Sequence, residues 1–131
     1  MPKADIGSGK KISTKDFERV QLRVGTIARI AVHPKSKKNY VMLVDTAAAD
    51  EDIQVVAALA DSLKMTELIG KQVVVVCNLP PVDVMGVESQ GMLLISYAGK
   101  KTVLIGPHSH CPPGAKAGGI MNGTFHHHER N

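Results

Sequence analysis

The sequence predicts an all-β fold, a five-stranded Greek-key barrel with one short helix and a flexible N-terminal tail. Short apolar runs separated by turn residues follow one another along most of the chain, which is typical of a small barrel or sandwich. One stretch of helical spacing lies between the third and fourth of these runs. With 131 residues, 44% of them hydrophobic and 21% charged, the chain can form one domain with a core.

Along residues 20–32, apolar residues recur with a period of two, as in a half-buried strand. The runs that we expect to form strands are residues 20–32, 40–46, 53–58, 73–76 and 92–97, with residues 102–105 as the second arm of a hairpin. Gly25, in the middle of the first run, suits a bulge or a sharp bend. We expect the first strand to end at His33, before a basic loop that reaches Asn39.

The remaining segments are predicted to be one helix, loops and tails. Residues 59–69 have helical spacing, and Gly70 closes this helix before the fourth strand. Residues 107–119 are rich in Pro and Gly and are expected to wrap over the surface. The chain is therefore divided into a flexible basic tail, a barrel domain and a polar, weakly structured tail: residues 1–15, 16–121 and 122–131.

A helix between the third and fourth strands of a small barrel is the arrangement of the OB-fold. Ligands of that fold meet the face of strands 2 and 3 together with the loops that join strands 1 to 2 and 4 to 5. In this chain those loops are residues 33–39 and 78–94. The sequence therefore predicts a binding surface on the side of the barrel where both loops lie.

The formal net charge of +4 is unevenly distributed along the chain. Residues 1–40 hold ten Lys or Arg against three Asp or Glu, whereas residues 41–90 hold two against eight. Such a basic segment is either a solvated arm or a face for a polyanion, because clustered Lys and Arg supply the phosphate-binding part of nucleic-acid affinity. Aromatic residues make up 3% of the chain, which disfavours binding by a platform of stacked rings.

The sequence contains no motif of a catalytic site: no P-loop, no dinucleotide-binding fingerprint, no nucleophile elbow and no recognisable triad. The histidines around Cys111 and at 126–128 lack the spacing of a zinc site. We therefore expect no enzyme activity, no metal and no cofactor. Cys77 and Cys111 make no disulfide framework, and no apolar run approaches the ~20 residues of a membrane span, so we expect a cytoplasmic protein without a membrane partner.

Several separated motifs occur in a fixed order along residues 16–119. They are Phe17-x-x-Val20-x-Leu22-Arg23-Val24-Gly25, His33-Pro34 with Lys38 and Tyr40-Val41, Val44-Asp45, Leu68-Ile69-Gly70-Lys71, Asn78-Leu79, Gly86-Val87-x-Ser89-Gln90-Gly91-Met92-Leu93 and Pro112-Pro113-Gly114-Ala115-Lys116. Together they resemble the tRNA-binding domain that occurs free-standing, at the C-terminus of bacterial methionyl-tRNA synthetases and in eukaryotic synthetase-associated cofactors.

This resemblance implies an OB-fold that binds tRNA by shape and charge, with little sequence preference and no chemistry of its own. It also implies a homodimer and a role as a trans-acting cofactor of an aminoacyl-tRNA synthetase. Two alternatives remain open: a dimeric chaperone of the CsaA type that binds peptides, and a scaffold within a multi-synthetase complex. The segment from Leu79 to Met85 favours the chaperone, since its Pro, Val and Met residues suit an apolar groove.

The chain departs from the family's pattern in both binding loops. Residues 79–85 hold no positive charge, where the family has several basic residues, and residues 36–40 hold a lysine in place of the family's acid. We therefore expect electrostatic binding to depend on the first loop and on Arg23. Ser89 and Gln90 either hydrogen-bond within their own loop or offer neutral donors to RNA. The RNA-binding residues that we predict are Arg23, Lys35, Lys37, Lys38, Asn39, Asn78, Ser89, Gln90, Gly91 and Met92.

Overall fold

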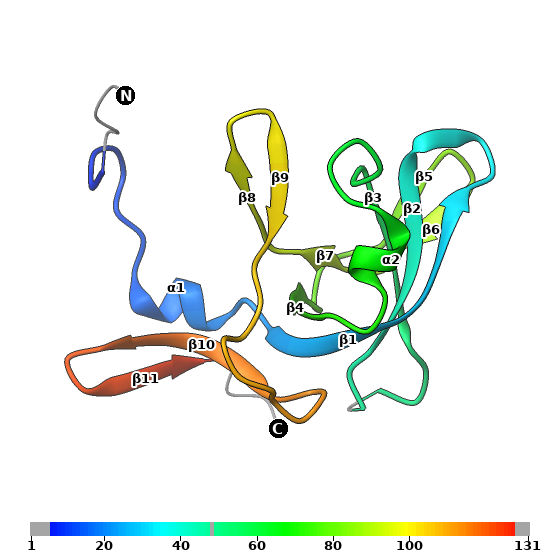
Figure 1. The fold of residues 1–131 in the computed structure, drawn as a ribbon. Helices are drawn as coiled ribbons and strands as arrows, with labels where there is room; N and C mark the ends of the chain where they lie inside the picture. The colour runs from blue at the N-terminus through cyan, green and yellow to red at the C-terminus, as the bar shows by residue number, and fades with distance from the viewer. Residues whose placement is uncertain (1–5, 48, 128–131) are drawn as a thin grey trace.

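One long strand organises the computed structural model, which describes residues 6–47 and 49–127 (Figure 1). This strand, β1 (Leu22–His33), pairs along its second half with β2 (Ser36–Asp45) and along its first half with β4 (Gln72–Val76). The strand β3 (Ile53–Ala57) pairs with β2 on the far side, and all of these pairs are antiparallel. The sheet therefore curls about β1, and the predicted OB-fold class is confirmed.

The concave side of this curled sheet holds the core. In β2 the buried residues Tyr40, Met42 and Val44 alternate with less buried ones. In β1 the predicted period of two holds only for Leu22 and Val24, because the bend of the strand then buries Ile27 and leaves Ala28 exposed. The helix α2 (Met65–Leu68) is a single turn between β3 and β4, and its Leu68 is fully buried. The largest fully buried side chains are Ile27, Met42, Leu68, Val44, Val55, Val73 and Val75.

Gly25 does not form the predicted bulge. It pairs regularly with Val73, and the register of β1 against β2 shifts further along, between Ile27 and Arg29. A Cβ atom at Gly25 would lie 2.5 Å from Val44 Cγ1. Glycine is therefore present here because β1 and β2 approach closely within the curled sheet.

Both predicted binding loops are more ordered than expected. The first is only a tight turn at Pro34-Lys35, because β2 already begins at Ser36. The second contains a hairpin of β5 (Val82–Val84) and β6 (Val87–Ser89), joined at Met85 and Gly86. Met85 and Gly86 both have positive φ, 51° and 92°, as a two-residue hairpin turn requires.

The predicted fifth strand is split in two. The strand β7 (Met92–Leu93) pairs with β4, whereas β8 (Ile95–Ala98) leaves the barrel to pair with β9 (Lys101–Leu104). The predicted hairpin is present, with its turn at Gly99 and Lys100. Figure 1 shows this hairpin projecting away from the curled sheet.

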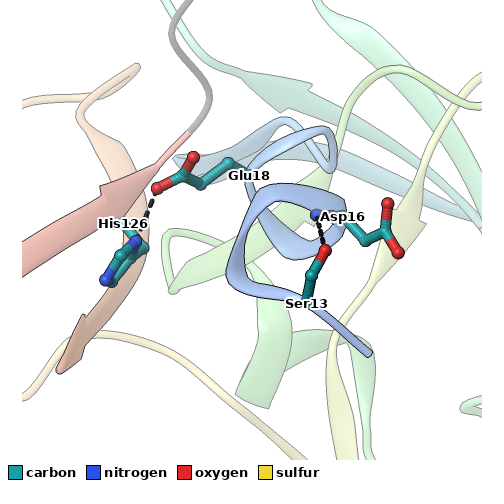
Figure 2. A network of polar contacts seen from close by, with 4 residues as sticks. All are labelled: Ser13, Asp16, Glu18 and His126. Atoms are coloured by element: carbon teal, nitrogen blue, oxygen red, sulfur yellow. Dashed lines mark hydrogen bonds and ion pairs between the residues drawn. The ribbon is translucent and has the colours of Figure 1, made fainter. Parts of the chain in front are cut away.

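The helix α1 (Thr14–Glu18) packs against a hairpin that extends the sheet beside β1. The strands β10 (Lys116–Met121) and β11 (Thr124–His127) form this hairpin, where the sequence predicted a surface wrap and a weakly structured tail. The helix α1 begins inside the predicted basic tail. Figure 2 shows Glu18 of α1 next to His126 of β11. Glu18 Oε2 lies 2.5 Å from His126 Nδ1. Residues 1–5 and 128–131 of the predicted tails lie outside the described residues.

Side chains close the barrel where β3 and β7 are not joined by a strand ladder. Ser89 Oγ accepts a hydrogen bond from Val56 N at 3.0 Å and donates to Gly91 O at 3.1 Å. Gln90 N donates to Gln54 O at 2.7 Å, and Gln90 Oε1 accepts from Gln54 N at 2.9 Å. Ser89 and Gln90 thus bind the edge of β3 as a neighbouring strand would.

Replacement of Ser89 by Ala should lower the free energy of unfolding by about 1–3 kcal/mol, because it leaves the amide of Val56 without its acceptor. Chemical denaturation in urea measures the change. Ser96→Ala is the control, since Ser96 is exposed on β8 and its replacement should have little effect. Equal stability of the two variants would contradict the proposed closure.

Candidate nucleic-acid interface

The predicted RNA-binding residues do not form one cluster. Arg23 lies near the start of β1, whereas the predicted lysines surround the turn that follows its end. The strand between Arg23 and His33 spans up to roughly 33 Å at about 3.3 Å per residue. The structure therefore separates a lysine end of the barrel from an arginine end.

The lysine end carries three exposed cations on a tight hairpin. Lys35 lies in the turn, and Lys37 and Lys38 lie at the start of β2; we call these three residues the lysine turn. Asn39 Nδ2 donates a hydrogen bond to Ser36 Oγ at 2.9 Å within the same hairpin. The lysine turn thus presents its charges on ordered backbone next to solvent.

His33 joins the lysine turn to the neighbouring β5–β6 hairpin. Its ring is buried, with 2% of the residue exposed. Nδ1 lies 2.9 Å from Lys35 N, which can only donate, and Nε2 lies 2.7 Å from Val84 O, which can only accept. These partners require the neutral tautomer with the proton on Nε2. His33 therefore shapes the turn that follows β1.

The β5–β6 hairpin has an apolar face and an acidic face. Val82 lies opposite Ser89 and Val84 opposite Val87, whereas Asp83 lies opposite Glu88. Since side chains alternate along strands, the two carboxylates point away from the face that carries the valines. The acids of this hairpin therefore do not line the surface beside the valines.

An apolar groove runs between this hairpin, β3 and β8. Its volume is about 560 Å³. Residues from each of these elements line it, among them Val55, Val82, Val84, Met92, Ile95 and Tyr97. Met92, a predicted contact residue, is exposed on this groove, and Gly91 lies close to the backbone of Val76 beneath it.

The arginine end is built mainly from contacts within the chain. Arg23 Nη1 donates a hydrogen bond to Gly114 O at 2.8 Å. Asn78 Oδ1 accepts from Gln21 N at 2.8 Å, and Asn78 Nδ2 donates to Arg19 O at 2.7 Å. Asn78 therefore ties the end of β4 to the segment before β1.

A second depression at the arginine end has a mixed electrostatic environment. Arg23, Cys77 and Gln90 line it together with Ala49 and Ile53, which flank the acidic residues 50–52 in the chain. Burial raises the pKa of the Cys77 thiol, and the nearby Arg23 guanidinium partly offsets this effect. Arg23 is the one cation among the described residues that line this depression, and it already donates to Gly114 O, so this end is a weaker site for phosphate than the three lysines of the lysine turn.

Metal binding and membrane insertion find no support in the part of the chain that the structure describes. No group of three or more His, Cys, Asp and Glu side chains is positioned there to hold a metal ion. Among the same residues, no helix is long and apolar enough to cross a bilayer.

The geometry defines a class of protein: an OB-fold domain with a basic turn beside an apolar groove. The chain belongs to the family described as "Putative tRNA binding domain", whose model matches residues 22–116. The match spans every strand from β1 to β9 and reaches the first residue of β10.

Curated relatives and solved structures agree with this assignment. The chain is 37% identical to the methionine–tRNA ligase of Archaeoglobus fulgidus over 88% of its own length but only 18% of the ligase. It is 40% identical to the methionine–tRNA ligase of Thermococcus kodakarensis, over 82% of this chain and 15% of the ligase. A MetRS related protein from Pyrococcus horikoshii superposes with a TM-score of 0.76 and 31% identity, covering 83% of this chain and 99% of that one. The CsaA chaperone protein from Picrophilus torridus superposes with a TM-score of 0.75 and 25% identity, covering 82% of this chain and 99% of the chaperone chain.

The raised pKa of Cys77 predicts slow alkylation of its thiol, because the thiolate is the nucleophile. In a Cys111→Ser background, the rate of reaction with iodoacetamide should rise with pH through a midpoint above that of the urea-unfolded chain. Mass spectrometry of quenched samples measures both profiles. Coincident midpoints would show that the fold does not favour the protonated thiol.

Proposed function

We propose that this chain is a non-enzymatic tRNA-binding module that recognises its ligand by shape and charge. The observation that carries the proposal is the lysine turn, three exposed cations on a hairpin that His33 fixes to the rest of the barrel. Fixed lysines give up less freedom on binding phosphates than lysines on a mobile arm would. The chain belongs to a family described as a putative tRNA-binding domain, which supports tRNA as the polyanion.

The other predicted contact residues have secondary roles in this proposal. Asn39 and Met92 lie beside the lysine turn and on the groove, where RNA held by the lysines would reach them. Ser89, Gln90 and Asn78 use their side chains to bind backbone groups of the chain itself. They preserve the shape of the surface, and Arg23 adds a weaker contact at the other end.

The similarity to methionine–tRNA ligases supports a role near a synthetase. This chain spans less than a fifth of those ligases, 18% of the Archaeoglobus fulgidus enzyme, so it corresponds to a small part of each. We infer a cytoplasmic cofactor that delivers or retains tRNA for a synthetase acting in trans. A scaffold in a multi-synthetase complex would use the same tRNA contacts.

Peptide binding is the second candidate, and the apolar groove is the observation that favours it. The structural similarity to CsaA chaperone proteins points the same way. The two candidates depend on different residues, because a peptide in the groove needs no lysine turn. Charge reversal at the lysine turn therefore separates them.

The double variant Lys37→Glu and Lys38→Glu should weaken binding of bulk tRNA at least tenfold. The slope of log affinity against log salt should also fall by roughly 0.7–0.9 for each phosphate that the variant no longer neutralises. Fluorescence anisotropy at two salt concentrations measures both quantities. The matched control is Arg29→Glu with Lys71→Glu, which makes the same change in net charge at exposed positions elsewhere. Unchanged tRNA affinity in the lysine-turn variant, or equal weakening in both variants, would refute the proposed contact.

We also propose that the chain forms a homodimer through the β10–β11 hairpin. This hairpin extends from the barrel, and β11 is the last strand of its sheet (Figure 1). Ile120, with 76% exposed, lies opposite the exposed Phe125. A two-fold contact between two copies would cover this apolar pair and the sheet edge together.

Ile120→Lys should convert the dimer to a monomer, because it places a charge in the centre of the proposed interface. Sedimentation equilibrium measures the mass of each species. Ile69→Lys changes an exposed apolar residue outside the hairpin and should leave the dimer intact. A wild-type monomer, or a dimer that tolerates Ile120→Lys, would exclude this interface.

A further inference from the structure

The β8–β9 hairpin is a basic projection that the tRNA-binding proposal does not use. It stands away from the curled sheet in Figure 1, and a hydrogen bond from Thr102 N to Ser62 Oγ at 2.9 Å anchors it. Lys100 and Lys101 occupy its tip, and residues 92–111 contain no Asp or Glu. Tyr97 is 77% exposed on this hairpin, one of only two tyrosines in the chain.

Tyr97 faces the apolar groove. Tyr97 lies opposite Thr102 and Ile95 opposite Leu104, whereas Ser96 and Val103 form a pair on the other face of the hairpin. Tyr97, Ile95 and Thr102 all line the groove. The hairpin is therefore the wall of the groove that faces the β5–β6 hairpin.

Each wall of the groove carries lysines at or beside its tip, although none of the described lysines lines the groove itself and Lys101 lies on the face of its hairpin away from the groove. The β5–β6 wall is joined through His33 to the lysine turn, and the β8–β9 wall ends in Lys100 and Lys101. The carboxylates of Asp83 and Glu88 lie on the face of their hairpin away from the groove valines. An anionic ligand with apolar groups in its middle complements this arrangement.

The edge of β3 beside the groove is already hydrogen-bonded at Gln54 and Val56. Along β3, Gln54 N and Val56 N already donate to side chains of Gln90 and Ser89, and Gln54 O already accepts from Gln90 N. A peptide bound by strand addition needs such backbone groups. This occupied edge, together with the lysines at or beside the tips of both walls, favours an RNA strand over an extended peptide.

We infer that the groove holds a single-stranded segment of RNA, with one base stacked on Tyr97 and flanking phosphates near the lysine turn and Lys100. The inference rests on the proposed tRNA binding and specifies which part of an RNA enters the groove. One aromatic ring gives one stacking position, in keeping with the scarcity of aromatic residues in the chain. A duplex keeps its bases paired and stacked, so it gains nothing from Tyr97.

The test compares a 12-nucleotide single-stranded RNA with a 12-base-pair RNA duplex by fluorescence anisotropy. Tyr97→Ala should weaken binding of the single strand about tenfold, within the ~5- to ~150-fold range of one stacked base, and change duplex binding by less than about twofold. The salt slope should not change, because no cation is removed. Tyr97→Phe should retain the affinity. Val103→Ala, on the other face of the same hairpin, is the matched control.

The possible outcomes separate this inference from the proposed function. If Tyr97→Ala binds the single strand as well as the wild type does, or weakens both RNAs equally, the groove does not hold a single strand. If tRNA still depends on Lys37 and Lys38 in that case, the proposed function stands. If Tyr97→Ala still binds RNA but no longer binds a fluorescent apolar peptide that the wild type binds, the groove is assigned to peptides. If the wild type binds no tRNA at all, both proposals fail.

Discussion

Closure of the barrel depends on one set of hydrogen bonds, in which Ser89 and Gln90 bind the edge of β3 in place of a neighbouring strand. β3 has β2 as its ladder partner on one edge only, and on the other edge Ser89 and Gln90 accept its amide hydrogens. These hydrogen bonds close the curled sheet over the buried valines, and they also fix where the β5–β6 hairpin leaves the barrel. The position of the groove wall is therefore set by the same hydrogen bonds that complete the core.

The candidate surface follows from how that hairpin is held at its two ends. Ser89 and Gln90 hold its base to β3, and His33 holds Val84, near its turn, to the lysine turn. Two anchors leave the hairpin little freedom to rotate, so its valines stay on the groove and its acids on the opposite face. Asp83 and Glu88 thus border the groove without lining it.

The sequence predicted what local periodicity determines and missed what depends on distant partners. The period of two in β2 and the apolar run of β4 follow directly from burial on the concave side of the sheet. The β10–β11 hairpin has a local signal in the dipeptide Asn122-Gly123, and both residues take the positive φ that a two-residue hairpin turn requires. Its strands nevertheless fall in segments for which composition predicts a surface wrap and a tail. No local pattern indicates that His33 reaches Val84, 51 residues away, or that Tyr97 faces a groove whose other wall is β5–β6.

The residues 79–85 show how a change of composition alters the kind of binding that a site can perform. Without cations, this segment cannot attract phosphate, but its valines alternate so that one face of a hairpin becomes apolar. Charge is concentrated at the lysine turn, and apolar area is concentrated in the groove beside it. Electrostatic attraction acts over about 8–10 Å in physiological salt and orients a polyanion, whereas apolar contact acts only where bases are unpaired. Under the proposed function, a surface divided in this way selects for RNAs that present a paired backbone and an unpaired strand side by side.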